Sequence, residues 1–247
     1  PQIPLPILFE DNHLLAVLKP AGLPTMGVES GRPSLVQVAK DHLKRKYQKP
    51  GNVYLGVVSR LNAAVSGVIL LARTSKAAAR LTEQFRCGEV EKTYWALVEG
   101  RPEPAEASCV DWLCKDERQQ RMVICAPEQP GSQQARLRYR TLRILPRVTL
   151  LEVLLETGRK HQIRVQLARR GHPVLGDRKY GATMAFPHGV ALHSRRLELQ
   201  HPVRKTPLRL EAPLPAAWRK KAGDDVEQVA SVGSERAKML LHVPMRV

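Results

Sequence analysis

The sequence predicts a mixed α/β fold, and three observations support this class. Apolar runs of strand length recur along the chain, and several alternate polar and apolar residues as half-buried strands do. Other segments place apolar residues at helical spacing behind a capping residue. With 247 residues, 43% of them hydrophobic, the chain can bury a sizeable core in one large domain or two small ones.

Strands are expected wherever such apolar runs lie between turn residues. A nearly unbroken apolar run follows a polar loop at residues 60–67, so a buried strand is expected after this loop and another strand before it. The other expected strands cover residues 7–9, 14–18, 91–100, 107–113, 121–125, 135–144, 148–156 and 191–199.

Two helices are expected behind capping residues. Residues 35–46 follow Ser34, which stands at capping-box spacing from Gln37. Residues 75–86 form the second helix, with Ser75 as its cap and a glycine directly after its last turn.

A third helix is expected at residues 159–170. Gly171 then supplies the left-handed residue with which helices commonly end. At helical spacing, His161, Arg164 and Ala168 fall on one side of this helix.

The charge balance favours an anionic partner. The chain carries 40 Lys and Arg residues against 23 Asp and Glu residues, a formal net charge of +17. RNA or DNA is the most economical partner for such a surface, although a solvated basic surface has the same composition. Only 4% of the residues are aromatic, which argues against an extended stacking platform for single strands.

Cysteine spacing and hydropathy exclude several other classes. The four cysteines form no C-x-x-C pair and have no histidine at zinc-ligand spacing, so we expect reduced thiols and no metal. They are Cys87, Cys109, Cys114 and Cys125. No apolar run reaches the ~18–20 residues of a membrane span, and no signal peptide is evident. We therefore expect a cytoplasmic protein without a membrane partner.

The polar loop at residues 60–67 is held between two strands, a suitable place to fix a reactive side chain. Its sequence resembles the signature of the RluA-type RNA pseudouridine synthases, His-Arg-Leu-Asp-x-x-Thr/Val-Ser-Gly followed by an apolar strand. Two positions depart from that signature. Ser59 stands where the family has histidine, and Asn62 stands where the family has the aspartate that carries out the chemistry.

Further motifs extend the resemblance. Residues 9–24 are similar to the family's opening motif, residues 92–100 to Lys-x-Tyr-x-Ala-Leu-Val-x-Gly, and residues 191–199 to the late Leu-His-Ala segment. The strongest match occupies residues 157–181, which contain Thr-Gly-Arg-x-His-Gln-Ile-Arg-Val. Because these motifs occur in the family's order between residues 7 and 215, chance is a poor explanation.

The resemblance implies a fold and a reaction. The implied fold is one α/β domain on a mixed, mostly antiparallel sheet, with flanking helices and a central cleft. The implied reaction turns uridine in RNA into pseudouridine without metal or cofactor. The target base is flipped out, the N1–C1′ bond breaks, the uracil turns and C5 joins C1′. Structured ribosomal or transfer RNA is the implied partner, and a monomer is expected.

The resemblance also implies residue roles. Asn62, Tyr94 and Arg164 occupy the catalytic positions, where the family's aspartate acts on the sugar, its tyrosine packs on the uracil and its arginine holds the carboxylate. Contacts to RNA are expected from Arg60, Lys92, Arg159, His161 and Gln162.

The same comparison divides the chain into two parts. Residues 1–218 are expected to form the synthase-like domain, without a separate N-terminal RNA-binding module. Residues 219–247 are polar and unpatterned, and are expected to form a loosely held tail.

Asparagine at position 62 changes the expected chemistry. An amide is nearly the size of a carboxylate, but it is uncharged and cannot serve as nucleophile or base. Loss of a central catalytic group typically removes several powers of ten in rate. Arg164 also loses its anionic partner, so we expect it to find solvent, another acid or an RNA phosphate.

Three functions remain open at this stage. The first is a family member that binds RNA without isomerising uridine, aiding RNA folding or ribosome assembly. The second, which we rank below the first, is an active synthase in which another group replaces the aspartate. The third is an engineered Asp→Asn trap, but a designed single change would have left the neighbouring histidine in place of Ser59. Binding to DNA or to a membrane surface is a distant alternative.

Overall fold

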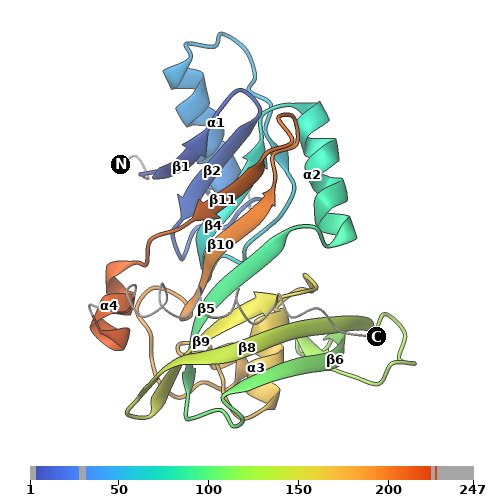
Figure 1. Ribbon diagram of the computed structural model, residues 1–247, viewed down its shortest axis with the longest axis vertical. Coiled ribbons are helices and arrows are strands. Elements are labelled where there is room, and N and C mark those ends of the chain that lie inside the picture. The colour runs from blue at the N-terminus through green and yellow to red at the C-terminus, as the bar shows by residue number, and fades with distance from the viewer. Residues whose placement is uncertain (1–3, 28–31, 224–225, 227–247) are drawn as a thin grey trace, which may run out of the picture.

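The computed structural model describes residues 4–27, 32–223 and 226. Within this part of the chain the strands form one 11-stranded sheet in the order β1-β2-β4-β10-β5-β9-β8-β6-β7, with β3 on β4 and β11 on β10 (Figure 1). The strands are β1 (Ile7–Glu10), β2 (Leu14–Lys19), β3 (Gly56–Val57), β4 (Ser66–Ala72), β5 (Glu91–Glu99), β6 (Glu106–Asp116), β7 (Arg121–Ile124), β8 (Gln133–Leu145), β9 (Val148–Leu155), β10 (Leu192–Gln200) and β11 (Pro207–Glu211). The helices are α1 (Leu35–Lys46), α2 (Ser75–Cys87), α3 (Gln162–Arg169), α4 (Ala216–Ala222) and the 3-10 helix η1 (Arg178–Tyr180).

One parallel strand pair joins the two halves of this sheet. All other pairs of neighbouring strands are antiparallel, whereas β4 and β10 run parallel and align Ser66 with His193 and Gly67 with Ser194. On one side of this pair lie β1 and β2, and on the other lie β5, β9, β8, β6 and β7. The mixed, mostly antiparallel sheet with flanking helices is therefore confirmed.

β2 and β4 are buried on both faces, which explains their continuous apolar sequences. Successive side chains of a strand point to opposite faces. Leu70 packs in one cluster with Leu81 of α2, while Leu71 packs in another with Leu43 of α1. These two helices therefore cover opposite faces of this half of the sheet (Figure 1).

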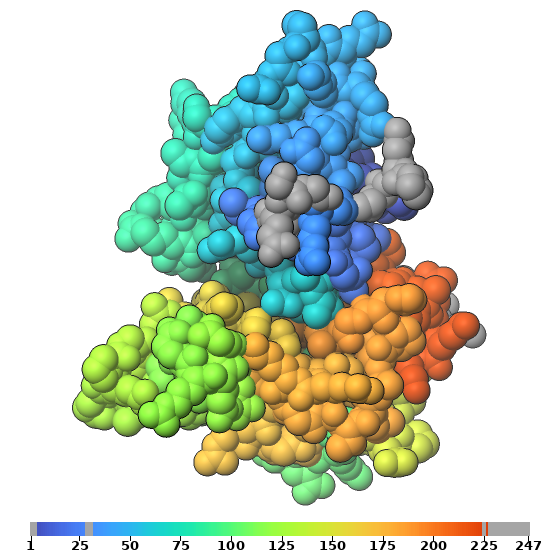
Figure 2. All heavy atoms as spheres, turned by 180° about the vertical axis from the view of Figure 1, so that it is seen from behind, coloured from blue at the N-terminus to red at the C-terminus, as the bar shows by residue number. Residues whose placement is uncertain are grey.

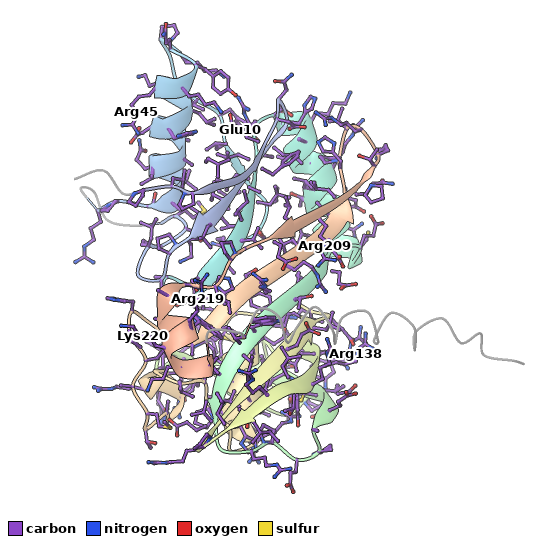
Figure 3. All side chains as sticks on the ribbon, turned by 60° about the vertical axis from the view of Figure 1, so that its left-hand side comes forward. Glu10, Arg45, Arg138, Arg209, Arg219 and Lys220 are labelled. Carbon is purple, nitrogen blue, oxygen red and sulfur yellow. The ribbon has the colours of Figure 1, made fainter. Side chains whose placement is uncertain are left out.

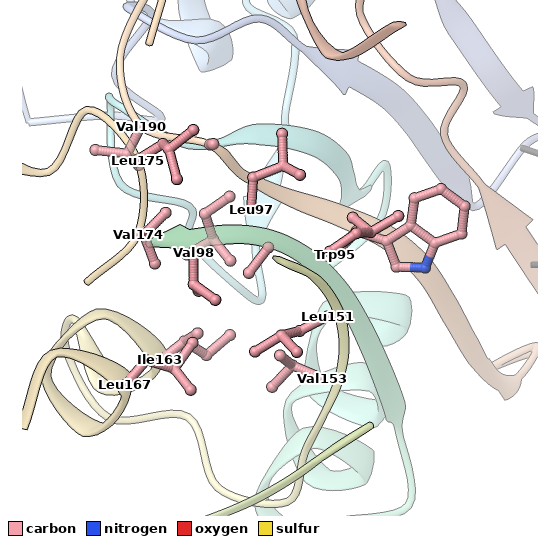
Figure 4. Packing of buried hydrophobic residues seen from close by; sticks show 14 of the residues in the cluster. Trp95, Leu97, Val98, Leu151, Val153, Ile163, Leu167, Val174, Leu175 and Val190 are labelled. Carbon is pink, nitrogen blue, oxygen red and sulfur yellow. The ribbon is translucent and has the colours of Figure 1, made fainter. Parts of the chain in front are cut away.

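The other half is built around a larger core between the sheet and α3. Ile163 and Leu167 of α3 pack toward Leu151 and Val153 of β9 and toward Val98 of β5 (Figure 4). Burial of an aliphatic side chain of this kind contributes about 1.5–3 kcal/mol. This packing fixes the first turn of α3 beside the centre of the sheet.

The helix starts follow the sequence at α1 but not at α2. The Ser34 hydroxyl accepts the Gln37 N–H at 3.3 Å, as expected for a cap. At α2 the cap is Thr74, whose extended backbone lets its hydroxyl accept the Ala77 N–H at 3.2 Å. The expectation that Ser75 caps this helix was wrong by one residue, because Ser75 already belongs to the first turn.

The start of α3 also differs from the expected range of residues 159–170. The helix begins at Gln162 because His161 has a left-handed backbone with φ 56°, which a right-handed helix does not contain. Gly171 follows the helix with φ 84° and ends it as expected.

α4 lies across the expected boundary at residue 218. Trp218 and Ala222 are buried in the larger core, so ordered packing extends beyond the proposed domain end. Of the expected tail, residues 224–225 and 227–247 lie outside the described residues.

The cysteines are unpaired, as expected: Cys109 and Cys114 are buried, Cys125 is half-buried and Cys87 is exposed. Across the described ranges, no helix has the length and apolar character of a membrane span. The same residues include no cluster of three or more His, Cys, Asp or Glu side chains suited to a metal ion.

Substitution of Gly67 by alanine should unfold the junction between the two halves. Gly67 has φ 123°, and an added Cβ would lie less than 3.0 Å from backbone atoms of Ser194. Such strain and overpacking cost about 3–5 kcal/mol, which chemical denaturation would measure. Gly51→Ala is the matched control, because an added Cβ there meets no atom within 4 Å. Equal stability of both variants would contradict this account of the junction.

Candidate active site

A pocket lies where the loop before β4 meets β5 and the start of α3. From behind, the surface is hollowed between the blue and cyan segments above and the green and yellow segments below (Figure 2). The pocket is lined by Arg60, Leu61, Asn62, Val65, Tyr94, Leu155, Arg159, His161, Gln162, Ile163, Arg164 and Leu192. All three expected catalytic positions and four of the five expected RNA contacts therefore line one pocket.

The loop that carries Asn62 is held in place by hydrogen bonds to its backbone carbonyls. The carbonyl of Ala63 accepts hydrogen bonds from the Gly22 N–H at 2.7 Å and from the Lys19 ammonium at 3.2 Å. The carbonyl of Ala64 accepts the Val190 N–H at 3.1 Å. Two segments that are distant in the sequence, residues 19–22 and residue 190, thus fix position 62 at the pocket.

Lys19 is a structural residue of this site that the sequence did not single out. Its side chain is fully buried, and its ammonium donates to the carbonyls of Pro20 at 2.9 Å, Leu23 at 2.7 Å and Ala63. Three acceptors match the three N–H groups of an ammonium. Burial lowers the pKa of Lys19 to about 7. Its position in the family's opening motif was the available signal, but only the fold shows the contact with Ala63.

The Asn62 side chain is fixed at both ends. Its Oδ1 accepts the Ala64 N–H at 3.0 Å, and its Nδ2 lies 3.0 Å from Nε2 of His161. The other ring nitrogen of His161, Nδ1, lies 2.8 Å from the Tyr180 hydroxyl. The amide is therefore part of a hydrogen-bonded chain that runs from position 62 through His161 to Tyr180.

His161 is neutral in this chain. Burial, reinforced by the charges of Arg164, Lys160 and Lys179, lowers the pKa of His161 to about 4. Both ring nitrogens have partners within the protein. The expected contact of His161 with RNA stays a prediction, and within the protein its ring is held between Asn62 and Tyr180.

Of the partners expected for Arg164, namely solvent, another acid or an RNA phosphate, the structure shows another acid. The Arg164 guanidinium donates to both carboxylate oxygens of Asp177, at 2.6 and 2.7 Å, and its charge lies 5.0 Å from the centre of the Tyr180 ring. The two partners are 6% and 1% exposed. This bidentate pair satisfies the arginine without a carboxylate at position 62. The sequence reasoning missed Asp177, although it lies inside the strongest motif.

Tyr94 lines the pocket from β5. Burial raises the pKa of its phenol, so the hydroxyl stays protonated at neutral pH. Lys92, two residues earlier on the same strand, is half-buried and is not among the lining residues. The pocket thus includes the tyrosine of this motif but not its lysine.

The remaining expected RNA contacts divide into two kinds. Arg60 and Arg159 are exposed at the pocket and can reach an anionic ligand. Gln162 is 2% exposed, and its side chain is used internally: Oε1 accepts from Thr157 at 2.7 Å, and Nε2 donates to the Arg136 carbonyl at 3.0 Å. Gln162 therefore shapes the loop before α3.

The lining is cationic and has no acid. No Asp or Glu is among the described residues that line the pocket. Both oxygens of the nearby Asp177 are held by Arg164. The site is therefore suited to binding an anionic or acceptor-rich ligand, and it offers no free carboxylate for nucleophilic or base catalysis.

Removing the charge of Asp177 should destabilise the protein strongly. Asp177→Asn leaves the buried Arg164 guanidinium without its counter-charge, which costs about 3–5 kcal/mol. The free energy of unfolding from urea titration measures the effect. Asp41→Asn on the exposed face of α1 is the control and should change stability little, because its Oδ1 accepts a surface hydrogen bond that an amide oxygen can retain. A small effect at Asp177 would contradict the buried pair.

Comparison with known proteins gives a consistent result. The pattern of the family described as RNA pseudouridylate synthase matches residues 13–169. The chain is 36% identical over 230 residues to ribosomal large subunit pseudouridine synthase D of Xylella fastidiosa, covering 86% of this chain and 67% of that protein. It is 33% identical over 222 residues to the dual-specificity RNA pseudouridine synthase RluA of Escherichia coli, covering 86% and 95%.

The fold agrees with these sequence matches. The solved structure of human RNA pseudouridylate synthase domain containing 4 superposes with a TM-score of 0.72 at 25% identity, over 92% of this chain and 93% of that chain. The chain spans only 67% and 63% of the synthase D relatives from Xylella fastidiosa and Nitrosomonas europaea. From the family pattern, the relatives and the shared fold, we conclude that this chain belongs to the RNA pseudouridine synthase family.

Proposed function

We propose that this protein binds structured ribosomal or transfer RNA in the cytoplasm through its synthase pocket and does not isomerise uridine at a useful rate. One observation carries the proposal: position 62 holds an amide, and no carboxylate among the described residues lines the pocket. The names of the relatives, which refer to RNA and to the large ribosomal subunit, support RNA as the partner. Aid to RNA folding or ribosome assembly is a role consistent with binding alone.

The chemistry explains why the amide matters. The family reaction needs a group that acts on the sugar as the N1–C1′ bond breaks, and a carboxylate can do this because it is anionic. The Asn62 oxygen instead accepts the Ala64 N–H, and its nitrogen faces His161. His161 is neutral but has no free ring nitrogen, and the Tyr94 phenol is protonated. None of these groups supplies the missing nucleophile.

An active enzyme with a replacement acid is the competing function. Among the described residues, Asp177 is a carboxylate in direct contact with the catalytic set, because it forms an ion pair with Arg164. It is 1% exposed and both of its oxygens are occupied. Using it would require breaking the buried ion pair, so the geometry favours RNA binding without turnover.

The rim of the pocket supports binding to phosphates. Arg60 and Arg159 are exposed there, and the net charge of +17 adds a long-range attraction to RNA. Arg164 is not available for this purpose, because Asp177 neutralises it. We therefore assign the salt-dependent part of binding to Arg60 and Arg159 before Arg164.

The wild-type protein should release no tritium from RNA labelled at C5 of uridine. Asn62→Asp should raise the release rate above this background by roughly 10³-fold or more, because it restores the carboxylate. Asn62→Ala is the matched control and should remain silent, since it also removes the amide without adding a charge. Robust turnover by the wild-type protein would refute the proposed function.

RNA affinity should fall steeply as salt rises. Arg60→Ala and Arg159→Ala should each lower the slope of log affinity against log salt by about one, because each removes a phosphate contact. Arg219→Ala is the control, since this exposed residue lies on α4, none of whose residues line the pocket (Figure 3). Fluorescence anisotropy with labelled RNA across a salt series measures the slopes. Unchanged slopes for both pocket variants, or binding insensitive to salt, would contradict this surface.

A further inference from the structure

The orientation of the Asn62 amide is set by the backbone. The Ala64 N–H is a donor, so the side-chain atom 3.0 Å away must be the acceptor Oδ1. Nδ2 is therefore the atom that faces Nε2 of His161 at 3.0 Å. Because an amide nitrogen only donates, Nε2 must carry no proton and must accept this hydrogen bond.

This requirement fixes the tautomer of His161. A neutral imidazole with a bare Nε2 carries its proton on Nδ1. Nδ1 lies 2.8 Å from the Tyr180 hydroxyl, which accepts that proton's hydrogen bond. The same hydroxyl also accepts the Met122 N–H at 3.2 Å, so Tyr180 is held in place from β7. Each contact in the chain has one consistent donor and one acceptor.

We propose that His161, held by Tyr180, is a positioning residue that orients the Asn62 amide through an unprotonated Nε2. In the Nδ1–H tautomer, the unprotonated Nε2 accepts a hydrogen bond from the amide. The same lone pair would repel the oxygen of a carboxylate. The inference deepens the proposed function, on which it rests for the identity of the pocket. One Nδ2 hydrogen is used by His161, and the second remains for a ligand acceptor such as a ribose hydroxyl or a uracil carbonyl oxygen.

An aspartate at this position would demand a different arrangement. One carboxylate oxygen could still accept the Ala64 N–H, but the other would face the Nε2 lone pair. The mismatch is relieved when the proton leaves Nδ1 and another binds Nε2, so the ring stays neutral and donates to the carboxylate. The Tyr180 O–H then rotates to donate to the bare Nδ1, and its oxygen still accepts from Met122. The number of protons is unchanged.

The environment of His161 opposes the alternative of simply adding a proton. Arg164, Lys160 and Lys179 act on the ring electrostatically, and Tyr180 packs edge-on against it. Asp177 compensates only one of these charges, because it is paired with Arg164. With a carboxylate at position 62, we therefore expect His161 to stay neutral and to carry its proton on Nε2 instead of Nδ1.

Nitrogen-15 NMR of the full chain labelled at histidine tests the proposal without RNA or turnover. In the wild-type protein the His161 signals, assigned by their loss in His161→Gln, should show a protonated Nδ1 and a bare Nε2. In Asn62→Asp they should exchange to a protonated Nε2. His193 is an internal control with the opposite tautomer, because its Nδ1 lies 2.8 Å from the Ser66 hydroxyl and its Nε2 lies 3.3 Å from the Ala212 carbonyl. Its signals should not move.

Two tyrosine variants complete the experiment. Tyr180→Phe removes the acceptor for Nδ1–H, so the His161 signals should shift toward a mixture of tautomers. Tyr139→Phe, whose hydroxyl donates to the Pro104 carbonyl at 3.1 Å, should leave them unchanged. A protonated Nε2 on His161 in the wild-type protein, or the same tautomer in the wild-type protein and Asn62→Asp, would overturn the proposal. Neither result depends on the tritium-release assay, so the two proposals fail separately.

Discussion

The parallel pairing of β4 with β10 is the constraint on which the rest of this structure depends. It joins two antiparallel halves at one point, where Gly67 lies against the backbone of Ser194. The loop before β4 is thereby carried from the half covered by α1 and α2 to the start of α3 in the other half. A side chain at that contact would force the halves apart, and position 62 would no longer face Arg164 across one pocket.

Charge balance in the pocket follows from a second constraint, the burial of Arg164. A buried guanidinium needs an anion, and in this protein Asp177 supplies it through two hydrogen bonds. Because Asp177 supplies the counter-charge of Arg164, no negative charge is required at position 62 to balance the arginine. The fold can therefore retain its pocket and its cationic rim while position 62 is uncharged.

The neutral amide of Asn62 is part of a hydrogen-bonded chain. Its oxygen and nitrogen each have a partner, and the chain continues through His161 to Tyr180, whose ring also covers Arg164. Asn62 is exposed, whereas His161 and Tyr180 are half-buried, and polar groups that are removed from water are usually hydrogen-bonded in this way. The pocket also presents hydrogen-bond donors to a ligand through the exposed Arg60 and Arg159.

From the sequence alone we could predict the family, the α/β class, the exact range of α1 and seven of the residues that line the pocket, because these depend on local periodicity and on motifs. The sequence did not determine the left-handed backbone of His161, the cap at Thr74, the clamp of Lys19 on Ala63 or the pairing of Arg164 with Asp177. Those features depend on which groups burial brings together across the chain. They became visible in the folded protein alone, since a buried polar atom pairs with whichever partner the packing places within reach.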